Sequence, residues 1–156
     1  MNRVNKFHGL RLYALSKIRG DFLQDNYLFV GEKGNIGNSW KAASTVMGFA
    51  LEQCCPVGYE LTDVKAYQSI EEAIPGKDII CTDSIPAEEK EKFAEIKIGL
   101  KQMKMANQNA ILNPCPPFYR GEIVEKDVID SDYFVGYKFK NCLLQVQQAV
   151  LCFLLG

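Results

Sequence analysis

The chain has 156 residues, 47% of them hydrophobic and 24% charged, which is the composition of one globular domain and excludes a largely disordered protein. Eighteen basic and nineteen acidic residues leave a net charge of −1, so no overall field would attract nucleic acid or an anionic membrane. The longest apolar run lies at the C-terminal end and is too short to span a bilayer. We therefore expect a cytoplasmic protein that binds neither nucleic acid nor membrane.

Six cysteines are present, and the chain does not begin with the charged and then apolar leader of a secreted protein. Their spacing contains no Cys-x-x-Cys pair, and the single histidine is His8. A zinc site needs thiolate or imidazole ligands in such clusters. We expect most of these thiols to be reduced core side chains, and we predict neither a metal nor a cofactor.

Hydrophobic periodicity predicts an alternation of helices and strands along the chain. In chain order, the expected elements are a helix over Leu10–Ile18, a strand over Tyr27–Val30, a helix over Trp40–Met47, a strand over Phe49–Cys55, a short helix over Ser69–Ile74, a strand over Asp78–Thr82, helical segments over Ala87–Ile96 and Leu100–Asn107, a strand over Ala110–Leu112, a helical turn over Val124–Ile129, a strand over Tyr133–Tyr137 and a helix over Asn141–Leu155. Such alternation predicts an α/β fold in three layers, a doubly wound, Rossmann-like sheet of about five mostly parallel strands.

Ligands of such sheets bind at the carboxyl ends of the strands. This rule selects Lys33–Asn38, Thr82 with Asp83, and Asn113–Pro117 as the candidate site. A carboxylate, a thiol, carboxamides and the free N–H groups of a helix would converge there, which suits a zwitterionic ligand such as an amino acid.

Three glycines follow the first strand at intervals of three, Gly31, Gly34 and Gly37, and they permit a tight turn or the close approach of a ligand. Their spacing differs from the Gly-x-Gly-x-x-Gly of dinucleotide-binding proteins, and no acidic residue ends the next strand. An NAD-linked or nucleotide-linked oxidoreductase domain therefore remains only an alternative.

Each candidate residue also has a structural interpretation. Asp83 is placed to cap the next helix, and Asn35 is placed to occupy a left-handed turn. Cys115 lies between prolines with no base nearby in the sequence, which disfavours a nucleophilic role. The lysines Lys97, Lys101 and Lys104 fall on one face of a predicted helix, which favours a solvated surface over a phosphate site.

Four stretches together resemble the second domain of the aspartate/ornithine carbamoyltransferase family, and the ornithine branch is the closer one. They are Gly31–Ser39, Thr82-Asp83, Cys115–Glu122 and Val128–Ser131. The resemblance covers the chain from about Leu12 to the C-terminus. It implies residues 1–20 as a terminal segment with a linking helix, and residues 21–156 as an amino-acid-binding domain.

The resemblance also implies roles for four residues. In that branch an Asn of the glycine turn holds the amino acid, and Asn35 matches it. An Asp after the third strand binds the amine, and Asp83 matches it. A His-Cys-Leu-Pro motif places a thiol and a backbone carbonyl beside the attacking amine, which assigns these places to Cys115 and Pro116. Asp83 and Cys115 would be the catalytic pair.

Three features of the family are missing from this sequence. Asp83 is followed by Ser-Ile-Pro-Ala-Glu where a Ser-Met-Gly loop is expected, and Leu143 stands where an Arg contacts the carbamoyl group. The carbamoyl-phosphate domain, with its Ser-x-Arg-Thr loop, is absent. The resemblance therefore implies that this chain is the amino-acid-binding domain of a trimeric enzyme that carbamoylates an amine. This chain alone would be inactive. The alternative is a regulatory or structural remnant.

The predicted final helix carries apolar residues on more than one face, which exceeds what one side of a sheet can cover. In the family, the last helix packs on the carbamoyl-phosphate domain. We therefore expect Leu10–Ile18 to pack against the final helix and the chain to form a homo-oligomer through this region.

Overall fold

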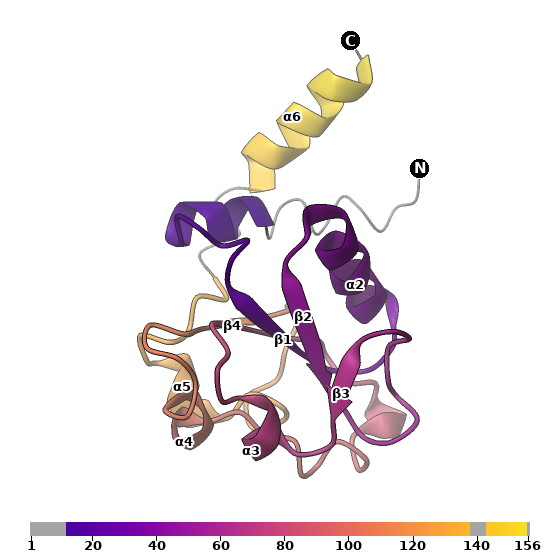
Figure 1. The fold of residues 1–156 in the computed structure, drawn as a ribbon, viewed down its shortest axis with the longest axis vertical. Coiled ribbons are helices and arrows are strands. Elements are labelled where there is room, and N and C mark those ends of the chain that lie inside the picture. The colour runs from indigo at the N-terminus through magenta and orange to yellow at the C-terminus, as the bar shows by residue number, and fades with distance from the viewer. Residues whose placement is uncertain (1–11, 138–142, 156) are drawn as a thin grey trace.

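The computed structural model describes residues 12–137 and 143–155 and has a five-stranded sheet at its centre (Figure 1). The strands lie in the order β3-β2-β1-β4-β5, and every neighbouring pair is parallel. Their bounds are Asn26–Val30 (β1), Ala50–Cys54 (β2), Lys65–Tyr67 (β3), Ile79–Thr82 (β4) and Ile111–Pro114 (β5). This arrangement confirms the predicted α/β class, and it puts β1 in the middle of the sheet with β2 and β4 on either side.

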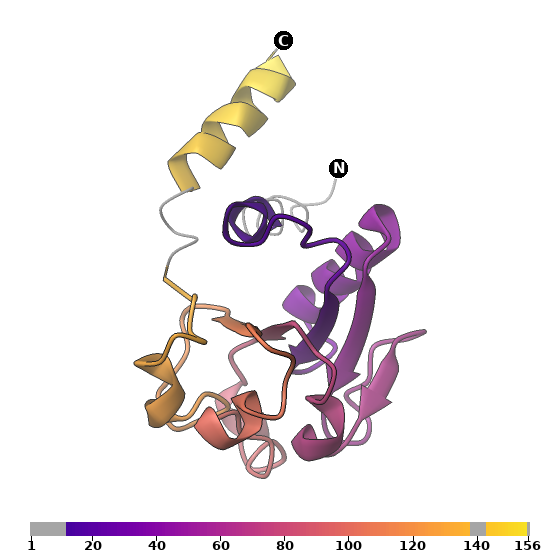
Figure 2. The same cartoon turned by 60° about the vertical axis from the view of Figure 1, so that its left-hand side comes forward.

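Helices cover both faces of the sheet, as Figure 2 shows. The helical elements are residues 12–18, α2 (Asn35–Met47), α3 (Ile70–Ala73), the 3₁₀ helix η1 (Ala87–Glu89), α4 (Leu100–Met103), α5 (Lys126–Ile129) and α6 (Leu143–Leu155). The helix over residues 12–18 and α2 pack on one face, whereas α3, α4 and α5 pack on the other. Gly48 ends α2, with a φ of 79° and an N–H that donates to the carbonyl oxygen of Ser44.

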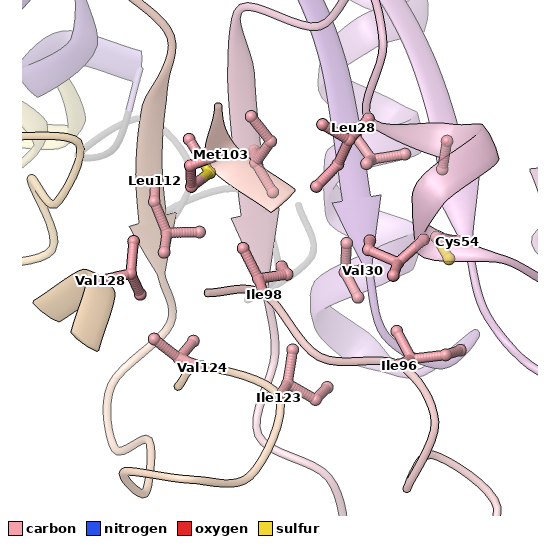
Figure 3. Close-up of a cluster of buried hydrophobic side chains, with 14 of the residues drawn as sticks. Leu28, Val30, Cys54, Ile96, Ile98, Met103, Leu112, Ile123, Val124 and Val128 are labelled. Atoms are coloured by element: carbon pink, nitrogen blue, oxygen red, sulfur yellow. The ribbon is translucent and has the colours of Figure 1, made fainter. Parts of the chain in front are cut away.

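Alternate residues of the central strands point to opposite faces and build two separate cores. On the first face, which α3, α4 and α5 cover, Leu28 and Val30 of β1 belong to one buried cluster with Met103 and Val128 (Figure 3). On the second face, which the first helix and α2 cover, the ring of Tyr27 lies 4.3 Å from that of Phe49 and 5.8 Å from that of Trp40, measured between centroids. A sheet buried on both faces explains why β1 and β4 read as continuous apolar runs in the sequence.

The fifth strand is not the one that the sequence predicts. Residues Lys65–Tyr67 form β3 by pairing with Glu52–Cys54, and nothing in their short, half-polar pattern marked them as a strand. The predicted strand over Tyr133–Tyr137 is wrong, because this segment makes only one bridge, between Phe134 and Leu112. Two hydrogen bonds with the backbone of Leu112, from 2.7 to 2.9 Å long, hold it beside β5.

Three predicted helices have different bounds in the structure. The helix α2 begins at Asn35, not at Trp40, because the chain turns directly into it after the glycine turn. The predicted helix over Ala87–Ile96 is wrong, since only Ala87–Glu89 is helical and the rest forms turns that bury Phe93 and Ile96. Similarly, the predicted helix over Leu100–Asn107 is shorter, since α4 ends at Met103, whose side chain is fully buried. Burial in the core outweighs local helix propensity here.

The final helix, α6, stands away from the sheet in Figures 1 and 2. Its side chains at Leu144, Leu151, Leu154 and Leu155 are exposed, whereas Leu12 and Leu15 of the first helix are buried in the core of the second face. The predicted packing of the first helix against α6 stays a prediction, since residues 10 and 11 and the side chains of Leu143, Val150 and Phe153 lie outside those that the structure describes. None of the helices in this part of the chain combines the length and apolar character needed to cross a membrane.

Candidate functional site

The loops that follow β1, β4 and β5 meet at the carboxyl edge of the sheet, because these three strands are parallel neighbours. The backbone N–H of Asp83 donates to the carbonyl oxygen of Val30 at 3.2 Å, and that of Cys115 donates to Thr82 at 3.0 Å. These bonds join the first residue beyond each strand to the last residue of its neighbour. Asn35, in the first turn of α2, follows β1 at the same edge.

Glycine allows the turn after β1 to approach its neighbours closely. Gly31 has a φ of +155°, and a Cβ at this position would lie 2.9 Å from a ring atom of Phe29 and 3.2 Å from the Cβ of Asp83. A Cβ on Gly37 would lie 2.7 Å from the carbonyl oxygen of Glu32. Gly31 therefore permits the contact with Asp83, and Gly37 permits α2 to pack against the turn.

A buried glutamine, Gln53 of β2, fixes the loop geometry and was missed by sequence reasoning. Its Nε2 donates to the carbonyl oxygens of Gly31 and Tyr59 at 2.9 and 3.0 Å, and its Oε1 accepts from the N–H of Leu61 at 2.7 Å. This side chain ties the turn after β1 to the loop after β2. The available signal was a carboxamide at the end of a predicted buried strand, where a polar group needs partners.

The half-buried carboxylate of Asp83 accepts a hydrogen bond from the N–H of Ser84 at 2.8 Å. Its predicted alternative role as a helix cap is wrong, because Pro86 takes the N-cap position of η1 and no side chain caps that helix. Asn35 is not in a left-handed turn either, since it lies in α2 and its carbonyl oxygen accepts from Ser39 Oγ at 2.7 Å. The structure thus removes both structural alternatives for these two residues.

Cys115 and Pro116 continue directly from β5. The thiol of Cys115 is buried and lies 3.8 Å from the carbonyl oxygen of Pro116, and the next peptide bond, Pro116-Pro117, is cis. Two polar atoms at the ends of β4 and β5, Thr82 Oγ1 and Asn113 Oδ1, are buried without a hydrogen bond to the described residues. Buried polar atoms in this state are uncommon in proteins.

The segment after Asp83, residues 84–97, is fixed by contacts with two other loops. The Tyr59 hydroxyl bonds to the Glu89 carboxylate, and the Lys92 ammonium lies 2.7 Å from Tyr59 and 2.8 Å from Glu89. Lys92 and then Tyr59 lower the pKa of Glu89 from its ordinary value. Lys90 pairs with Glu122 at 2.7 Å on the other side. Because these ion pairs are open to solvent, they contribute little to the free energy of folding, and their main effect is to fix the position of the segment.

Two further sequence predictions concern the face that carries three lysines and the absence of a metal site. Lys97, Lys101 and Lys104 do not share a helix face, because α4 covers only Leu100–Met103. Within residues 12–137 and 143–155, no group of three or more His, Cys, Asp and Glu side chains is placed to hold a metal ion.

The chain is similar to the family described as aspartate/ornithine carbamoyltransferase, Asp/Orn binding domain, whose model matches residues 24–154. An ornithine carbamoyltransferase from Paracidovorax citrulli is 30% identical over an alignment that covers 97% of this chain and 56% of the relative. One from Campylobacter jejuni subsp. doylei is 31% identical, over 81% of this chain and 49% of the relative. The chain therefore spans about half the length of these curated relatives.

Solved structures resemble the fold over nearly the whole chain. Ornithine carbamoyltransferase from Burkholderia thailandensis superposes with a TM-score of 0.82 and 26% identity, over 91% of this chain and 51% of that one. The enzyme from Thermus thermophilus gives a TM-score of 0.87 at 19% identity, over 98% and 55%, and at that identity the likeness shows the fold alone. The alternative of an NAD-linked oxidoreductase finds no support in these similarities.

Proposed function

The chain belongs to the aspartate/ornithine carbamoyltransferase family, and we propose that it forms the acceptor half of a carbamoyltransferase, which binds an amino acid related to ornithine at the carboxyl edge of the sheet. The observation that carries this proposal is the pair of backbone bonds from Asp83 to Val30 and from Cys115 to Thr82. These bonds hold Asp83 and Cys115 just beyond the ends of adjacent strands. The family resemblance gives the carboxylate and the thiol of these residues the role of binding the acceptor.

In this proposal each residue has a distinct role. The Asp83 carboxylate accepts hydrogen bonds from the ammonium at the far end of the amino acid. Asn35, in the first turn of α2, donates to the carboxylate of that end, where the helix N-terminus also favours an anion. Cys115 and the carbonyl oxygen of Pro116 orient the attacking amine. These four residues hold and align the acceptor, and none of them forms a covalent intermediate.

The reaction itself needs a second component. The nitrogen lone pair of the acceptor amine attacks the carbamoyl carbon of carbamoyl phosphate, the carbon–oxygen bond to phosphate breaks, phosphate leaves with the electron pair, and the amine loses a proton. Holding the amine in line with that carbon gives the rate advantage of proximity. The charge on the departing phosphate must be stabilised by groups from outside this chain, such as a carbamoyl-phosphate domain, because the chain has no arginine-bearing phosphate loop.

An NMR titration of the 156-residue chain with ornithine tests this proposal. Ornithine should shift the amide signals of Asp83 and Asn35, and Asp83→Asn should weaken binding by about tenfold or more, because it removes a charge-assisted bond. The matched control is Asp21→Asn, an exposed carboxylate in the loop before β1, which should bind like the original chain. If ornithine binds equally to both variants, or does not bind at millimolar concentration, the acceptor proposal is wrong.

A further inference from the structure

Thr82, the last residue of β4, carries a hydroxyl group that has no hydrogen-bond partner among the described residues. The residue is completely buried, so solvent does not supply a partner either. Its carbonyl oxygen, in contrast, accepts from the N–H of Cys115 at 3.0 Å. On folding, the hydroxyl loses its hydrogen bonds to water without replacement, which is unfavourable. The Thr82 hydroxyl therefore lowers the stability of the chain.

The packing around Thr82 does not require a hydroxyl. Val30 of β1 and Pro114 of β5 flank the residue in the register of the sheet. Alternate residues of a strand point to the same face, so the side chain of Thr82 lies on the first face with that of Ile80, which belongs to the core there. Valine has the same branched shape and an equal preference for strands, and it would suit these apolar neighbours. The hydroxyl is therefore the one feature of this side chain that the fold leaves unexplained.

Thr82 lines a hollow at the candidate acceptor site, together with Asp83 and Ser84. The volume of the hollow is about 10 Å³, which is close to the least space that one water molecule needs. An ammonium group has a similar size. A second carboxylate of the hollow, that of Glu122, is paired with Lys90 at 2.7 Å. The hollow thus offers a hydroxyl and the Asp83 carboxylate to one small group.

The chemistry of an ammonium matches this pair of side chains. An ammonium has three N–H donors and no acceptor, whereas a threonine hydroxyl has two lone pairs that accept. In a site closed to water, each N–H donor needs an acceptor from the protein. A carboxylate next to a hydroxyl provides acceptors in two directions, so the hydroxyl takes a donor that the carboxylate does not reach.

We propose that Thr82 is a further residue that binds the amino acid, and that its hydroxyl accepts a hydrogen bond from the same ammonium that Asp83 binds. The hydroxyl then gains its partner only in the complex, and the ligand-free chain carries it at a cost in stability. A hollow of this size has no room for a substituent, so Thr82 and Asp83 together select an unsubstituted ammonium. This proposal rests on the proposed function, which assigns the ammonium to Asp83.

Thr82→Val removes the hydroxyl and keeps the shape of the side chain. In NMR titrations of the 156-residue chain, this variant should bind ornithine about tenfold more weakly, which is the size of one hydrogen bond to a charged group. Thr82→Ser retains the hydroxyl and should bind ornithine nearly as tightly as the original chain. The matched control Thr45→Val makes the same change at an exposed position in the last turn of α2, and it should leave the affinity unchanged.

A second ligand shows which group of ornithine the hydroxyl contacts. The compound 5-aminopentanoate keeps the carboxylate and the side-chain amine of ornithine but lacks the α-ammonium. Thr82→Val should therefore leave its affinity unchanged, although the same variant weakens ornithine. An equal loss for both ligands would show that the hydroxyl contacts another group, and it would overturn the proposal.

Urea unfolding without ligand provides a readout that a purely structural role would move in the opposite direction. Thr82→Val should raise the urea midpoint, because it removes a buried hydroxyl that has no partner. Thr45→Val should change the midpoint little. A midpoint that falls in Thr82→Val would mean that the hydroxyl stabilises the fold, and the proposal would be wrong.

The outcomes separate this proposal from the proposed function. If Thr82→Val binds ornithine as tightly as the original chain while Asp83→Asn binds it weakly, the acceptor function stands and the role of Thr82 is refuted. If the original chain does not bind ornithine at millimolar concentration, the acceptor function fails and the role of Thr82 fails with it.

Discussion

Gly31 and Asp83 come into direct contact at the carboxyl edge of the sheet, where a Cβ on Gly31 would lie 3.2 Å from the Cβ of Asp83. The two residues are the first ones after β1 and β4, and the hydrogen bond from Asp83 to Val30 holds them side by side. The position of the Asp83 carboxylate therefore depends on the absence of a side chain fifty-two positions earlier in the chain.

Gly31→Ala should lower the free energy of unfolding by about 2 kcal/mol, because the added methyl meets Phe29 and Asp83 at a φ that alanine rarely adopts. It should also weaken ornithine binding by displacing Asp83. The matched control is Gly20→Ala, where no atom lies within 4 Å of the added Cβ. Urea denaturation measures the free energy of unfolding of both variants. An unchanged midpoint for Gly31→Ala would show that the turn can relax.

Gln53→Leu should cost about 3 kcal/mol of stability, since it leaves the carbonyl oxygens of Gly31 and Tyr59 and the N–H of Leu61 without their partner. Gln68→Leu, at an exposed position, makes the same chemical change where no such network exists and should be nearly neutral. Thermal and urea unfolding should rank the two variants in this order. Equal losses would mean that the Gln53 bonds contribute nothing specific.

The cysteines should differ widely in reactivity at pH 8. Burial raises the pKa of Cys54 to about 12 and that of Cys55 to about 12, so both remain protonated and inaccessible in the folded chain, whereas Cys152 is exposed. Because the thiolate is the reactive form, iodoacetamide should modify Cys152 before Cys54 and Cys55, which it should reach only in denaturant. Peptide mass spectrometry distinguishes the sites, and early modification of Cys54 would contradict the buried structure of β2.

The purified chain should not make citrulline from ornithine and carbamoyl phosphate. The family resemblance puts Leu143 where an arginine is expected, and this sequence contains no Ser-x-Arg-Thr loop to stabilise the transferred group. A colorimetric assay for citrulline measures this directly, with Asp83→Ala as the control for a contaminating enzyme. Citrulline formation that Asp83→Ala abolishes would show that the chain builds a phosphate site in another way.

We expect the chain to self-associate through α6, because Leu144, Leu151, Leu154 and Leu155 are exposed on it and apolar surface of this kind is rarely left open to water. Leu151→Glu should shift the species seen by light scattering to a monomer. The matched control Val46→Glu changes an exposed apolar residue of α2 and should leave the oligomer intact. A monomer at high concentration in the original chain would refute this expectation.

Local sequence determined the central part of the fold and the candidate site. Tyr27–Val30 and Ile79–Cys81 are apolar throughout because β1 and β4 are covered on both faces, and this pattern is legible without tertiary structure. Parallel strands end at the same edge, so Asn35, Asp83 and Cys115 could be assigned to one region from their positions after predicted strands.

Tertiary structure alone decided the edges of the sheet and the short helices. The three residues of β3 are a strand only because β2 offers an open edge, and Tyr133–Tyr137 is not one because it makes a single bridge to β5. Residues 90–95 carry a helical pattern but form turns, since burying Phe93 and Ile96 contributes more than local propensity. The hydrogen bond from Gln53 to Gly31 joins residues far apart in the sequence, which no local pattern encodes.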